Sequence, residues 1–66
     1  MGENLYRVVY RARLSDHAPV MGEVNLRSFK EKFELDFEQV VSDYLKLVSG
    51  GYVMLDEILS SDIVSK

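Results

Sequence analysis

One amphipathic segment with a start signal and a stop signal constrains the fold of this chain more than any other feature. In "LDFEQVVSDYLKLVSGG", residues 35–51, six apolar side chains recur at steps of three and four: Phe37, Val40, Val41, Tyr44, Leu45 and Val48. That spacing places them on one face of an α-helix. Asp36 is a favourable N-cap, with Gln39 three residues later as in a capping box. Since Gly50 and Gly51 favour left-handed termination, the pattern predicts a helix over residues 37–49.

Two stretches with period-two alternation precede this helix. They cover residues 6–14 and residues 20–27, and the polar cluster "SDHAP", residues 15–19, separates them. Alternation of β-branched and aromatic side chains with polar ones is typical of strands, and such a cluster is typical of a turn. We therefore expect a β-hairpin with a five-residue loop.

The hydrophobic pattern also suggests how the two strands pair. Folding the chain about His17 places Tyr10 opposite Val24 on one face and Arg11 opposite Glu23 on the other. Both faces then match apolar with apolar and positive with negative charge, which is the condition that specifies a register.

The chain after the diglycine predicts a third strand. Residues 52–59 fit this strand, and residues from about 60 onward fit a frayed C-terminal tail. Residues 28–35 and 55–66 are each compatible with strand, helix or coil. Strand, strand, helix, strand predicts one small α+β domain over residues 1–66: a three-stranded sheet of ββαβ order, antiparallel or mixed, with the helix packed on one face.

The composition argues against catalysis and against a metal or cofactor site. The 66 residues contain no cysteine and one histidine, so thiolate and imidazole-rich metal sites are excluded. Ser15, Asp16 and His17 are adjacent in a predicted turn, where they cannot align as nucleophile, base and orienting group. Asp56 and Glu57 are expected on opposite faces of a strand, which prevents them from acting as a pair. We predict a protein that is not an enzyme and needs no cofactor.

Charge is distributed unevenly along the chain. Residues 1–30 carry five basic and three acidic side chains, and residues 31–66 carry three and eight, which gives net charges of +2 and −5. Two candidate binding surfaces follow. The first is an acidic helix-and-tail surface, with these carboxylates: Glu34, Glu38, Asp43, Asp56, Glu57 and Asp62. The second is the sheet face opposite the helix, with these side chains: Arg7, Val9, Arg11, Arg13, Met21 and Arg27.

These features favour a small protein-binding module that occupies a partner's surface and blocks or modulates it. The acidic second half suits a basic partner such as a DNA-binding host factor, with carboxylates in place of phosphates as in a DNA mimic. Small virus-encoded inhibitors have a similar size and composition. One alternative is a nucleic-acid-binding module that uses the arginine-rich sheet face, although a net charge of −3 opposes it. Another alternative is a small structural or regulatory subunit of a larger complex.

Two expectations concern assembly and location. An uncovered sheet face with Val9 and Met21 among arginines predicts a weak homodimer through that face, with the arginines near carboxylates of the second copy. The sequence has no apolar run near the roughly 20 residues of a membrane span, and "MGENLYR" lacks the pattern of a signal peptide. A cytoplasmic protein without membrane contact is therefore expected.

Overall fold

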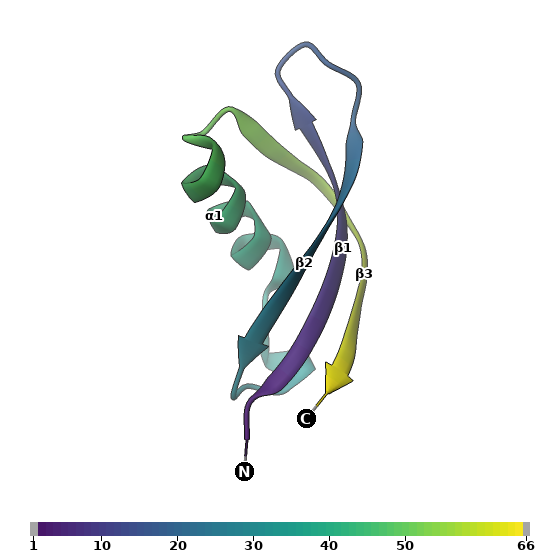
Figure 1. The fold of residues 1–66 in the computed structure, drawn as a ribbon, viewed down its shortest axis with the longest axis vertical. Coiled ribbons are helices and arrows are strands. Elements are labelled where there is room, and N and C mark those ends of the chain that lie inside the picture. Colours follow the sequence, from purple (N-terminus) through teal and green to yellow (C-terminus); the bar gives the residue numbers. More distant parts are fainter. Residues whose placement is uncertain (1, 66) are drawn as a thin grey trace.

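The fold is a three-stranded antiparallel sheet with one helix lying against one of its faces (Figure 1). The computed structural model describes residues 2–65. Its elements in chain order are β1 (Asn4–Leu14), β2 (Val20–Ser28), the 3₁₀ helix η1 (Lys32–Glu34), α1 (Phe37–Ser49) and β3 (Val53–Ser65). The strand order is β2-β1-β3, so the first strand is central. The predicted α+β class and ββαβ order are confirmed, and the sheet is antiparallel rather than mixed.

The core is small and lies between β1 and α1. Its buried apolar side chains are Tyr6, Val8 and Ala12 from β1, and Val41 and Leu45 from α1. Because a chain of this length hides only about 60% of the surface that its unfolded form exposes, a core of this size is expected. Many large apolar side chains therefore remain at the surface, and their distribution decides where partners can bind.

The helix begins and ends at the predicted residues. Asp36 is the N-cap, and one of its carboxylate oxygens accepts a hydrogen bond from the backbone N–H of Gln39 at 3.2 Å. The Gln39 side chain donates to Asp43 at 2.9 Å instead of reaching back to the cap, so the second bond of the capping box is replaced. Gly50 ends the helix with φ of 67°, a left-handed conformation that costs glycine little.

The hairpin has a different register from the predicted one. Tyr10 lies opposite Gly22 rather than Val24, a shift of two residues that leaves every side chain on its predicted face. At the tip, the His17 N–H donates to the Leu14 carbonyl at 2.8 Å and closes a tight turn on the β1 side of the loop. The Tyr10 ring also lies over Gly22, where a Cβ would come within 2.5 Å of the ring. The bare glycine thus provides the space that the aromatic ring needs.

The connection from β2 to α1 is held by a buried polar cluster. The Tyr6 hydroxyl donates to the Lys30 carbonyl at 2.7 Å, and the Asn4 amide donates to the same oxygen at 3.2 Å. The Tyr6 ring also meets Phe37 edge-on, with 5.5 Å between centroids. These contacts fix the chain just before η1 (Lys32–Glu34), in the segment that the sequence left undecided.

The last strand is longer than predicted. It runs to Ser65, so the expected frayed tail from about residue 60 is wrong within the described residues. Its pairing with β1 is interrupted three times, so that Asp56, Leu59 and Val64 are extra residues between consecutive pairs. The central strand offers a full-length edge for pairing, and this long-range partner stabilises a segment whose local sequence is weak in strand signals.

Candidate functional site

Within residues 2–65, the sheet face opposite α1, here called the open face, carries arginines and carboxylates in equal number. The register with β1 places these side chains on it: Arg7, Arg11, Arg13, Arg27, Glu23, Asp56, Glu57 and Asp62. Three of the six carboxylates predicted for the acidic helix-and-tail surface, Asp56, Glu57 and Asp62, therefore lie on the open face beside the arginines. A face with balanced charge lacks the excess of positive charge on which phosphate binding depends, which weakens the nucleic-acid alternative.

Arg11 is held by two carboxylates of β3. Its Nε donates to Asp56 at 2.7 Å and its Nη2 donates to Glu57 at 3.2 Å. The hydrogen bond to Asp56, followed by the charges of Glu57 and Asp56, raises the pKa of the Arg11 guanidinium above its ordinary value. The sequence prediction that Asp56 and Glu57 point to opposite faces is wrong. Arg11 pairs with Glu57 and Ala12 with Leu55, so Asp56 is the extra residue of a bulge and can turn toward the same arginine.

The predicted pair between Arg11 and Glu23 is also absent. The two-residue shift of the hairpin places Met21 opposite Arg11 and Glu23 opposite Val9. The arginine keeps a cross-strand carboxylate partner, but it comes from β3 and not from β2.

The remaining acidic side chains of the predicted helix-and-tail surface lie on the helix side of the molecule. Glu34 accepts a hydrogen bond from the Glu31 N–H at 2.8 Å, and Asp43 accepts one from Gln39 at 2.9 Å. Glu38 is exposed in the first turn of α1, where a negative charge is favoured by the helix dipole. The six predicted carboxylates are thus divided between two faces, and they do not form one surface as expected.

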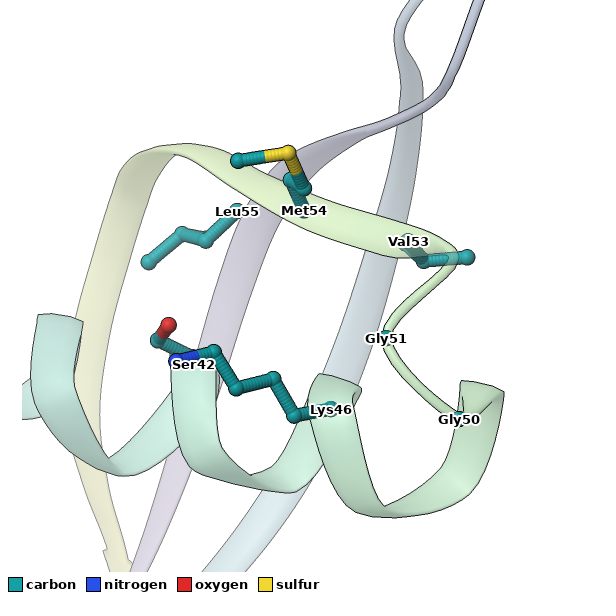
Figure 2. A pocket seen from close by; sticks show the side chains of 7 residues that line it. All are labelled: Ser42, Lys46, Gly50, Gly51, Val53, Met54 and Leu55. Atoms are coloured by element: carbon teal, nitrogen blue, oxygen red, sulfur yellow. The ribbon is translucent and has the colours of Figure 1, made fainter.

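A hollow separates the C-terminal half of α1 from the start of β3 (Figure 2). Its volume is about 520 Å³, and its lining residues are Ser42, Lys46, Gly50, Gly51, Val53, Met54 and Leu55. Figure 2 shows the Leu55 side chain directed from β3 toward the helix turn that carries Ser42 and Lys46. The two glycines form the far wall without side chains, so the hollow stays open at the helix terminus.

A second hollow continues the first toward the start of the helix. It has a volume of about 300 Å³ and is lined by Asp36, Glu38, Gln39, Ser42 and Leu55. Because Ser42 and Leu55 line both hollows, the two form one trough along the β3 side of α1, here called the α1–β3 trough. One end of the α1–β3 trough is mainly apolar, and the other is acidic.

Three further observations on the described residues concern the hairpin turn, metal binding and membrane spanning. Ser15, Asp16 and His17 are exposed in the hairpin turn, where Ser15 has φ of 32°. Within residues 2–65 no group of three or more carboxylate or imidazole side chains is arranged to hold a metal ion. In the same range, no helix has both the length and the apolar character needed to cross a membrane.

Comparisons of the chain with protein-family models, with characterised proteins and with solved structures found no match. A functional proposal for this chain therefore has to be based on the geometry of its own residues. The sequence reasoning missed the α1–β3 trough, although one signal pointed to it. The diglycine that ends the helix leads within two residues into the apolar run Val53, Met54 and Leu55, which brings a strand back alongside the helix.

Proposed function

We propose that this protein is a non-enzymatic protein-binding module that blocks or modulates a partner, and that the α1–β3 trough is its contact surface. The observation that carries the proposal is the polarity of the trough. Its apolar end is lined by Val53 and Leu55, and its acidic end by Asp36 and Glu38. A partner segment that presents an apolar side chain beside a basic one fits both ends.

The chemical character of the α1–β3 trough suits a segment of protein. An apolar side chain entering beside Leu55 gains from desolvation, while a lysine or arginine near Glu38 gains from charge complementarity. Glu38 is exposed, so its attraction for a partner is screened by salt. The proposed complex should therefore weaken as ionic strength rises, and weaken less when the partner's apolar side chain dominates the contact.

The proposal is tested with two variants of the α1–β3 trough and a matched control for each. Ser42→Gln places a longer neutral side chain in the hollow, and Ser60→Gln makes the same change on the exposed open face. Glu38→Lys reverses charge at the acidic end, and Asp16→Lys makes the same reversal in the exposed hairpin turn. This turn lies at the opposite end of the sheet from the start of α1 (Figure 1). All four substitutions are at exposed or half-buried positions, and circular dichroism checks that each variant folds.

The measurement is capture from a cell lysate followed by quantitative mass spectrometry, with each variant compared with the wild type. We expect a protein that the wild type and both controls retain and that both trough variants lose. The affinity for that protein, once purified, should fall with added salt. Equal capture by all five proteins, or loss with Ser60→Gln instead of Ser42→Gln, would contradict the assignment to the trough.

A further inference from the structure

The outer edge of β2 is unprotected. β2 (Val20–Ser28) pairs with β1 without interruption, from Asn4 opposite Ser28 to Ala12 opposite Val20. Exposed edge strands usually carry a bulge, a proline or charged side chains that prevent pairing with another chain. β2 has no bulge, proline or lysine, and its two charged side chains, Glu23 and Arg27, are of opposite sign, whereas β3, at the other edge, is interrupted three times. The backbone donors and acceptors along the outer edge of β2 are therefore available to a further strand.

An apolar surface adjoins this edge on the helix side of the sheet. A narrow hollow of about 120 Å³ lies between β2 and α1, and its lining residues are Val8, Val24, Asn25, Leu26, Val40, Val41 and Tyr44. Tyr44 is 41% exposed, and one turn later Leu47 is 84% exposed. The helix contacts β3 more closely than β2, so this flank stays uncovered. It lies on the opposite side of α1 from the α1–β3 trough.

The side chains of β2 are self-complementary when two copies run antiparallel about Asn25. A two-fold axis at Asn25 places Glu23 opposite Arg27 of the second copy, and it does so twice. On the helix side, the same axis places Val24 opposite Leu26. Opposite charges then pair on one face and apolar side chains on the other, which is the pattern that stabilises antiparallel strands. An axis at Val24 would instead place Glu23 opposite Asn25 and lose the charge pairs.

We propose that two copies of this chain associate through antiparallel pairing of their β2 strands about Asn25. The two sheets then form one six-stranded sheet, with both helices on the same side. The uncovered flanks beside Val24 and Leu26 meet at the axis, where each reduces the exposed apolar surface of the other. This interface differs from the sheet-face dimer expected from the sequence. On that face Arg11 already binds two carboxylates of its own chain, and Val9 is half-buried.

The test uses charge reversals at Glu23 and Arg27, which are both exposed. In Glu23→Arg and in Arg27→Glu, each two-fold pair brings like charges together. We expect each single variant to dimerise on the order of tenfold more weakly than the wild type. An equimolar mixture of the two variants should restore association, because every pair in the mixed dimer is complementary. The double variant E23R/R27E should dimerise like the wild type.

Sedimentation equilibrium measures the dimer dissociation constant of each variant, and circular dichroism reports whether the variant is folded. Arg13→Glu, a matched reversal on the open face away from β2, should leave the wild-type constant unchanged. A wild type that remains at 7.6 kDa at high micromolar concentration would overturn the proposal. So would a dimer that tolerates both β2 reversals, or one that is lost with Arg13→Glu, since either outcome places the contact away from the β2 edge.

Discussion

Replacing Gly22 with alanine tests the contact that sets the hairpin register. A Cβ at this position would lie 2.5 Å from Cζ, 2.6 Å from the hydroxyl oxygen and 2.8 Å from Cε2 of Tyr10. The ring must therefore leave its place over β2. Such overpacking lowers the free energy of unfolding by about 1–3 kcal/mol. The lower conformational entropy of the unfolded alanine variant offsets about 0.4–1 kcal/mol of this loss. We expect Gly22→Ala to lower the free energy of unfolding by about 1–2 kcal/mol.

Urea denaturation at one fixed protein concentration measures this loss, and for a domain of this size it corresponds to a fall in Tm of about 5–15 °C. The control is a double-mutant cycle with Tyr10→Val, which removes the two ring carbons and the hydroxyl oxygen near the new methyl group. In that background Gly22→Ala should be neutral or slightly stabilising. An equal loss in both backgrounds would show that the ring is not the cause, and the explanation of the register would then be wrong.

Three further predictions concern the contacts that hold the helix and its connection. Asp36→Ala removes the acceptor for the Gln39 N–H and should cost about 1 kcal/mol in urea unfolding, while Asp36→Asn should cost less; equal losses would exclude the cap as the cause. Tyr6→Phe removes the bond to the Lys30 carbonyl and should cost about 0.5–1.5 kcal/mol by the same method, and an unchanged midpoint would contradict this. Gly50→Ala places a Cβ at φ of 67° and should lower the free energy of unfolding by about 1–2 kcal/mol, measured by thermal unfolding. Gly50→Asn should lower it by less, because asparagine tolerates the left-handed conformation better. An alanine variant more stable than the wild type would refute the argument.

The helix was predictable because its signals are local. Asp36 and Gly50 lie within one or two residues of the ends that they determine, and the apolar spacing between them is a property of the segment itself. The faces of β1 and β2 were predictable for the same reason, since these two strands pair without interruption and alternation alone fixes their faces. The faces of β3 were not, because its three interruptions break the alternation. The α+β class followed from these two results.

Features that depend on distant contacts were not predictable. The hairpin register depends on how the Tyr10 ring fits over Gly22, and a shift of two residues still leaves apolar side chains opposite one another on the helix side of the sheet. The bulge at Asp56 arises where β3 adjusts to β1, and no local sequence signal marks it. The bulge lets two consecutive carboxylates, Asp56 and Glu57, bind Arg11 from the same side of the strand. Regular alternation would place them on opposite faces. The α1–β3 trough likewise needs the relative position of α1 and β3.

The central position of β1 also has a consequence for how the chain assembles. Its neighbour β2 follows after one tight turn, but Arg11 meets Glu57 only 46 residues later. Pairing between close segments is fast, whereas pairing across a long separation is slow because closing a long loop costs entropy. After the hairpin forms, the edge of β1 that faces β3 in the native sheet therefore keeps its backbone groups unpaired until β3 is added. During folding, the chain is most prone to aggregate in the interval before β3 arrives.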